Sequence, residues 1–481
     1  MNLGFLKMIP EFMCSYPDGP QQIYCTPKTF CDYETESFRD KITAEINWNS
    51  PFTLKNMVTK FDIYCSNKLT YILFGGSFMF GHLIFLIFFS QMIDTKGRKD
   101  VIQYSLLVLI VSLGAMICVP GVNMFIYVMY GSLCVYGIAS GILNLQGWIY
   151  LIEFMPKNYQ AGAIIISNSG KGIALILGSL FFLDISKRQS FLLMFNLALA
   201  ALVFSLISNF IPESPKYYYM MKKYRMARQV LVGIGKRYNG QQIKAIFREE
   251  AIDQNLEIDE NYMDDTDISQ QQLQGNSHLE TENKIIKEGY GVFDRGNFIR
   301  TLQQDKVFRI NAFGIIFCHA ICSFSFSLFT FMLPSLKGNI YLNGFLIGSF
   351  EVLAYSFSGL MMKLLGLRYQ IIICYLISFT SGLLYQILDF SESGELTGAV
   401  LLACLMFGVA ANSNSTAYAA YVCCPQELTA TFFVVQSFIT SILVAFSPII
   451  AEYDAQFVVI GFLLLTALCT IVSFYIKLKN I

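Results

Sequence analysis

The chain has 481 residues, of which 54% are hydrophobic and 14% are charged, and its formal net charge is zero. Soluble proteins average about 45–50% apolar and about 25% charged residues. The composition therefore excludes an ordinary soluble enzyme of this length and indicates a membrane protein. Neutral charge, with no basic patch carrying interleaved aromatic residues, also excludes a nucleic-acid partner.

The chain begins with a polar segment, 1–68, that carries Cys14, Cys25, Cys31 and Cys65. If this segment faces an oxidising compartment, the four cysteines can form two disulfides, in any of three pairings. The sequence holds no CxxC pair, His-rich tract or HExxH motif, so we expect neither a metal site nor a cofactor.

Eleven apolar runs follow, each long enough for a bilayer-crossing helix of about 20 residues. They lie at about 69–91, 101–120, 123–151, 160–183, 190–211, 307–332, 342–365, 369–388, 397–422, 430–450 and 455–476. Small residues such as Gly75, Gly81 and Gly172 recur in the runs and allow membrane helices to pack closely. The pattern predicts an all-α polytopic protein.

One long polar linker, 212–306, separates five runs in 69–211 from six in 307–481, which predicts two helical halves. Its acidic, Gln-rich middle has too few apolar residues to fold and is predicted to be disordered. Short loops on the linker's side carry Lys and Arg, whereas the opposite loops are mixed or acidic. The positive-inside rule then places the linker in the cytoplasm and the cysteine segment outside.

A short charged motif that contains a glycine lies between the first two runs, at Asp94-Thr95-Lys96-Gly97-Arg98-Lys99. Gly97 permits a tight turn, and the charged residues can reach oppositely charged groups at neighbouring helix ends. The alternative is a basic turn that only fixes topology.

This motif resembles the D-x-x-G-R-K/R signature of the major facilitator superfamily. The stretch Pro212-Glu213-Ser214-Pro215 resembles the PESP box of the organic cation/anion transporter family within that superfamily. Weaker matches follow the family's order along the chain: Lys60 to Cys65, Glu153, Glu351 and Glu427-Leu428. The resemblance implies a major facilitator fold of twelve helices, with Asp94, Gly97, Arg98, Lys99, Glu153, Glu213 and Glu427 in a conformational-switch motif.

The resemblance also implies that segment 1–68 is the end of a first helix followed by a large external loop. Only eleven of the expected twelve spans are visible, so we expect a further apolar helix to be encoded upstream of Met1. Some family positions differ here. Gln160 replaces an Arg, and Ser441, which occupies a position that is charged in cation or anion carriers, is neutral.

Ionisable residues inside apolar runs are costly and therefore candidates for substrate binding. Lys171 could attract an anionic substrate or pair with Glu351 from the other half, and Glu351 could carry a proton. His82 and His319 are further candidates. For each of them the alternative is a structural hydrogen bond or ion pair.

The polar cluster around Asn412 and Asn414, together with Asn168, could hold substrate through amide groups. Hydrogen bonding between helices is the alternative reading of these amides.

The sequence predicts a transporter, secondary-active or facilitative, that moves a small organic solute by alternating access, either alone or with a coupled proton or other ion. A receptor or scaffold that no longer transports is the alternative, and an enzyme is not expected. We expect the protein in the plasma membrane, with an internal organelle membrane as the alternative.

Overall fold

The computed structural model describes residues 3–15, 23–31, 43–89, 97–155, 157–239, 295–336, 338–388, 394–424 and 428–476. Two residues of the predicted switch motif, Asp94 and Glu427, lie outside these ranges, as does the acidic middle of the linker.

Within the described ranges, eleven helical segments are long and apolar enough to span a membrane. The first half contains α5 (Lys68–Ile84), α7 (Arg98–Cys118), α8 (Ile126–Phe154), α9 (Lys157–Leu180) and α10 (Gln189–Phe210). Single π-helical segments, η2 (Phe85–Phe89) and η4 (Phe181–Ile185), continue α5 and α9, and the 3₁₀ turn η3 (Asn123–Phe125) precedes α8.

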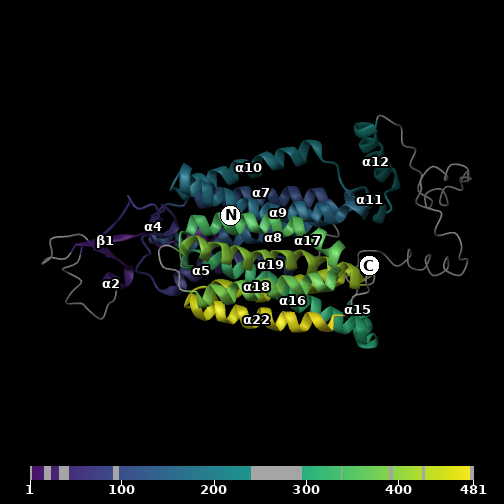
Figure 1. Cartoon of the computed structure of the whole chain (residues 1–481). Coiled ribbons are helices and arrows are strands. Elements are labelled where there is room, and N and C mark those ends of the chain that lie inside the picture. The colour runs from purple at the N-terminus through teal and green to yellow at the C-terminus, as the bar shows by residue number, and fades with distance from the viewer. Residues whose placement is uncertain are drawn as a thin grey trace, which may run out of the picture.

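The second half contains α16 (Lys306–Met332), α17 (Ile340–Leu365), α18 (Leu367–Ile387), α19 (Glu395–Cys423), α20 (Thr429–Ala445) and α22 (Ala455–Tyr475). The 3₁₀ turn η6 (Leu333–Ser335) follows α16, and the short α21 (Ser447–Ile450) follows α20. These helices lie side by side along the bundle (Figure 1). The predicted class, an all-α polytopic membrane protein of eleven visible spans, is confirmed.

The N-terminal segment folds into a small domain that the sequence did not reveal. It contains α1 (Leu3–Leu6), β1 (Phe12–Ser15), β2 (Ile23–Cys25), α2 (Pro27–Cys31), β3 (Thr43–Ile46) and α4 (Met57–Lys60). The central strand β1 pairs antiparallel with both neighbours, so that Met13 lies opposite Tyr24 and Glu45. Disulfides join Cys14 to Cys25 and Cys31 to Cys65.

The disulfide-bonded domain and the linker helices occupy opposite ends of the bundle (Figure 1). The linker helices are α11 (Pro215–Met220), α12 (Tyr224–Asn239) and α15 (Arg295–Gln304). We call the two ends the disulfide end and the linker end. This arrangement agrees with a topology in which the two parts face opposite sides of the membrane, and which side each faces stays a prediction.

The two halves meet most closely where α9 crosses α17. At this crossing Gly172 faces the backbone of Gly348, and a Cβ built on either glycine would lie 2.7 Å from the other's carbonyl oxygen. Small residues allow this approach because lipid gives membrane helices no hydrophobic drive to associate. A second contact between the halves joins α5 to α20.

Candidate functional site

A cavity of about 440 Å³ lies between the two halves. Helices α5, α8 and α9 form one wall, and α16, α17, α19 and α20 form the other. Its volume is in the range of small-molecule sites, about 300–1,000 Å³. A site built from both halves changes shape when the halves move, as alternating access requires.

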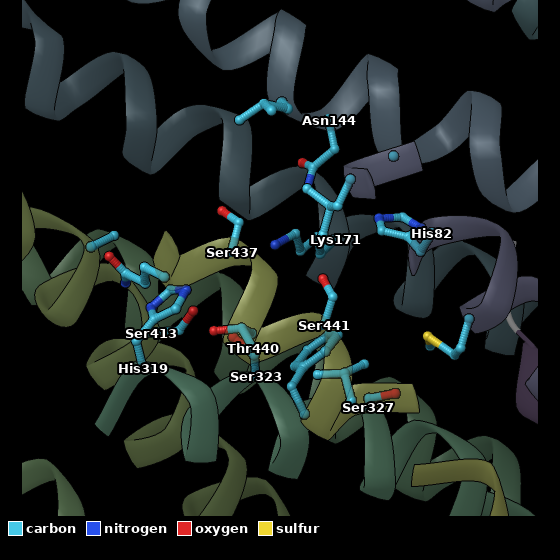
Figure 2. Close-up of a pocket in the computed structure, with 18 of the residues that line it drawn as sticks. His82, Asn144, Lys171, His319, Ser323, Ser327, Ser413, Ser437, Thr440 and Ser441 are labelled. Carbon is cyan, nitrogen blue, oxygen red and sulfur yellow. The ribbon is translucent and has the colours of Figure 1, made fainter. Parts of the chain in front are cut away.

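Lys171 is the only Lys, Arg, Asp or Glu side chain among the described residues that line the cavity. It is exposed to the cavity rather than packed into a helix interface. Figure 2 shows Lys171 near Asn144 and His82 of its own half and facing Ser437 and Ser441 of the other. Lys171 is therefore the group in the described wall that can offer a positive charge to a ligand.

A polar stripe on α20 lies on the opposite wall and consists of Gln436, Ser437, Thr440 and Ser441. Gln436 is 1% exposed, and its Oε1 atom has no hydrogen-bond partner among the described residues. The Oγ1 atom of Thr440 is likewise unpartnered within the described part of the chain. Unsatisfied polar groups of this kind are costly, and a ligand's polar groups can satisfy them.

Both predicted histidines line the cavity, but their surroundings differ. His319 Nδ1 lies 3.1 Å from Thr416 Oγ1, and that hydroxyl donates to the carbonyl of Asn412. The hydroxyl oxygen can therefore accept from Nδ1–H, which orients the His319 ring. In the described residues, His82 Nδ1 has no hydrogen-bond partner.

Three predicted substrate residues, Glu351, Asn412 and Asn414, lie behind the cavity wall rather than in it. Asn412 donates to the carbonyl of Ile371 on α18, at 3.2 Å. Asn414 donates to Ser358 of α17, at 2.7 Å. Its Oδ1 atom lies 3.5 Å from the amide nitrogen of Asn168, which lines the cavity. These amides connect helices, as the alternative reading of the sequence expected.

Glu351 is fully buried behind Tyr355, whose side chain lines the cavity. The Tyr355 hydroxyl donates to one carboxylate oxygen, Oε1, at 3.1 Å. The other oxygen, Oε2, has no hydrogen-bond partner in the described residues. No ion pair within 4.0 Å joins Glu351 to Lys171 among these residues.

Seven aromatic residues of the described ranges also line the cavity. They are Phe78, Phe85, Trp148, Phe326, Phe331, Tyr355 and Phe433. Apolar and aromatic walls with a few convergent polar groups are typical of sites for organic ligands. The combination suits a small ligand that carries one anionic group on an aromatic body.

A second candidate site, the predicted switch motif, forms a charged cluster at the linker end. The Glu213 carboxylate accepts hydrogen bonds from the backbone N–H groups of Arg98 (3.0 Å) and Lys99 (3.1 Å). These are the first N–H groups of α7, where a negative charge is favoured by the helix dipole. The Arg98 side chain forms an ion pair with Glu153 of α8, at 3.4 Å, with both side chains nearly buried.

The turn before α7 depends on a glycine. Gly97 has a φ of +86°, and a Cβ at this position would lie 2.8 Å from Glu213 Oε2. The Arg98 guanidinium lies over the Tyr217 ring, with 5.5 Å between the guanidinium carbon and the centre of the ring. Burial, and after it the neighbouring Glu213 carboxylate, raises the pKa of Tyr217, which keeps this phenol neutral.

The structure thus brings Lys171, His82, His319, Asn168 and Ser441 into one cavity and Gly97, Arg98, Lys99, Glu153 and Glu213 into one cluster. Sequence reasoning missed Trp148 and three α20 residues, Gln436, Ser437 and Thr440. A signal was available, because Gln436, Ser437, Thr440 and Ser441 repeat at helical spacing within an otherwise apolar run.

A family model confirms the assignment drawn from the motifs. The model described as Major Facilitator Superfamily matches residues 52–448, well over half of the chain. The chain belongs to the Major Facilitator Superfamily. Its fold and family are those of a multi-pass membrane transporter of solutes.

Relatives and solved structures agree with this membership. Organic anion transporter 3 of Mus musculus is 27% identical over 203 residues, which cover 41% of this chain and 36% of the mouse protein. The match thus spans little more than a third of that relative. Among solved structures, the partially occluded inward open conformation of the xylose transporter XylE from E. coli has a TM-score of 0.59.

That similarity covers 86% of this chain and 90% of XylE at 11% sequence identity. The human organic anion transporter MFSD10 (TETRAN) has a TM-score of 0.52 at 16% identity, covering 87% of each chain. At identities this low, the structural similarity establishes a common fold and nothing beyond it.

Proposed function

We propose that this protein transports a small organic anion across a membrane by alternating access. The observation that carries the proposal is the cavity between the two halves, whose described wall contains Lys171 and no acidic side chain. A lysine in a site of low dielectric attracts an anion, because the lysine's own charge is costly there unless it is paired. The name of the mouse relative agrees with this substrate class.

Contacts that hold the halves together at the disulfide end support alternating access. The Tyr341 hydroxyl of α17 donates to the carbonyl of Pro51, at 3.0 Å. Lys7 forms an ion pair with Glu452, next to α21. The N-terminal domain is also bonded to the first half through Lys60, which donates to the carbonyl of Met116. The domain therefore bridges both halves at this end.

The switch cluster, in contrast, joins α7, α8 and the start of the linker within one half. We infer that this structure is the state closed at the disulfide end, and that breaking the bridge lets the cavity open there. The positive-inside topology would make this an inward-facing state, and we propose the plasma membrane as its location.

The test is exchange of radiolabelled anions across proteoliposomes, with an aromatic sulfonate, an aromatic carboxylate and an aliphatic dicarboxylate as probes. Lys171→Met should weaken binding of a transported anion by about 2–5 kcal/mol, which is at least about thirtyfold in affinity. Lys363→Met is the matched control, because Lys363 is exposed near the linker end of α17. Equal exchange by wild type and Lys171→Met would refute Lys171 as the anion site.

A further inference from the structure

Among the described residues, Glu351 is the buried acid next to the cavity, and the proposed anion site gives it no role. It lies on α17, three residues beyond the glycine that α9 packs against, and is 0% exposed. In the described structure the Tyr355 hydroxyl donates to Oε1, and Oε2 has no hydrogen-bond partner. A carboxylate this poorly solvated is costly unless a cation balances it or a proton neutralises it.

The charged and titratable groups around Glu351 are few. Lys171 of α9 is the cation that acts on it electrostatically. The lysine precedes Gly172, and a Cβ on Gly172 would lie 3.2 Å from the backbone nitrogen of Val352, the residue after Glu351. Tyr355 lies on its own helix, and Cys322 of α16 lies beyond Tyr355, with the Tyr375 hydroxyl of α18 3.0 Å from its sulfur.

Two further helices pack on α17, namely α18 and α19. The one Lys, Arg, Asp or Glu of α18 is Arg368 at the start of the helix, and it donates to the carbonyl of Phe474. Within its bounds, α19 has Glu395 at its first residue and no other Lys, Arg, Asp, Glu or His. His82 and His319 line the same cavity as Lys171, and the lysine acts electrostatically on both of them. Lys171 is thus the one nearby cation for Glu351 among the described residues, and it is also the one cation the cavity offers to a substrate.

From this competition for one lysine we propose that Glu351 is the proton-binding site of a coupled anion–proton symport. The inference rests on the proposed function. In the empty carrier, Lys171 is positive and Glu351 is negative, so the site is neutral. The Tyr355 hydroxyl then passes its proton to Glu351 Oε1 and takes a proton from cavity water in exchange. This step forms the neutral acid and releases Lys171 to pair with the substrate's anionic group.

The loaded site is neutral as well, because the lysine and the substrate anion cancel while Glu351 carries the proton. One monovalent anion and one proton cross in each cycle, and no net charge moves. The Tyr355 side chain lines the cavity and its hydroxyl reaches Glu351, so it provides the route from cavity water to the acid. A site that stays neutral in both forms avoids the large cost of moving an unpaired charge through the bilayer.

The experiment uses the full chain in proteoliposomes with radiolabelled naphthalenesulfonate. A sulfonate is a strong acid and does not cross lipid as a neutral molecule, so any proton that accompanies it is moved by the protein. For wild type, a lower external pH should drive net uptake, with one proton entering per anion. A membrane potential set with potassium and valinomycin should have no effect.

Glu351→Gln gives a distinctive result under this proposal. The empty variant carries an uncompensated Lys171, whereas the loaded variant is neutral, so only the loaded form crosses readily. Net uptake should fall about a hundredfold, as expected for an unpaired charge in the bilayer core. Exchange of internal for external anion should stay near the wild-type rate. Glu395→Gln, at an exposed helix end, is the matched control and should behave as wild type.

The outcomes separate this inference from the proposed function. Wild-type exchange with no response of net uptake to the pH gradient overturns the proton site alone, as does a Glu351→Gln variant that keeps its response. If Glu351→Gln binds an aromatic anion but neither exchanges nor accumulates it, Glu351 has a structural role and the proposal is wrong. If wild type exchanges neither the sulfonate nor any other probe, the proposed function itself fails.

Discussion

Replacing Gly172 with alanine is expected to force α9 away from α17 at the crossing beside Lys171. A Cβ at this position would lie 2.7 Å from the Gly348 carbonyl oxygen, 2.9 Å from Val352 Cγ2 and 3.2 Å from the Val352 backbone nitrogen. Two of the three atoms belong to the backbone of α17 and cannot rotate away. The helices must therefore separate by a few tenths of an ångström, and overpacking of this kind costs about 1–3 kcal/mol.

Gly170 provides the matched control, because a Cβ there would meet no atom within 4 Å. Both substitutions add one methyl group to the same helix, two residues apart, so differences in helix propensity cancel. The measurements are the melting temperature of the purified protein and the rate of anion exchange. Gly172→Ala should lower both, since the crossing also positions Lys171, and Gly170→Ala should change neither. Equal effects of the two variants would refute the view that this crossing holds the halves in register.

The remaining predictions concern the linker-end cluster. Arg98→Met should leave Glu153 buried without its cation, at a cost of about 3–5 kcal/mol in stability, and should slow exchange without changing anion affinity. Glu153→Gln should cost less stability, because Arg98 keeps its contact with Tyr217. If the losses of stability simply add in the double variant, the two residues are not coupled. Gly97→Ala should destabilise the protein by about 1–3 kcal/mol, because its φ is positive and its Cβ would crowd Glu213. An unchanged melting temperature would contradict that account.

The spans were predictable because an α-helix that crosses lipid must be apolar for about 20 residues, and such a run can be recognised in the sequence without knowledge of the fold. The partner of Arg98 was also predictable, since a buried guanidinium between helix ends needs a carboxylate, and Glu153 occupies such an end. The roles of the amides were not. Asn168 lines the cavity and Asn412 bonds to α18, although both are polar residues in apolar runs.

The sequence could not rank these amides, because which face of a helix lines the cavity depends on how the two halves pack. The small sheet of β1, β2 and β3 was hidden for a different reason. Its strands are three or four residues long and are held by strand pairing and by the Cys14–Cys25 disulfide rather than by an alternating apolar pattern. For Glu351, the sequence predicted that it lies deep in the seventh apolar run, but it could not predict that the side chain lies behind Tyr355.

The most direct test of the central claim uses the chain's own tryptophans, of which there are two. Trp148 lines the cavity, and Trp48 lies in the N-terminal domain, so a Trp48→Phe protein reports on the cavity alone. Titration with nitrobenzenesulfonate, an anionic aromatic quencher, should quench Trp148 to saturation. The neutral sulfonamide should not, and Lys171→Met should abolish the effect of the sulfonate. Saturable quenching that persists unchanged in Lys171→Met would contradict an anion site at Lys171.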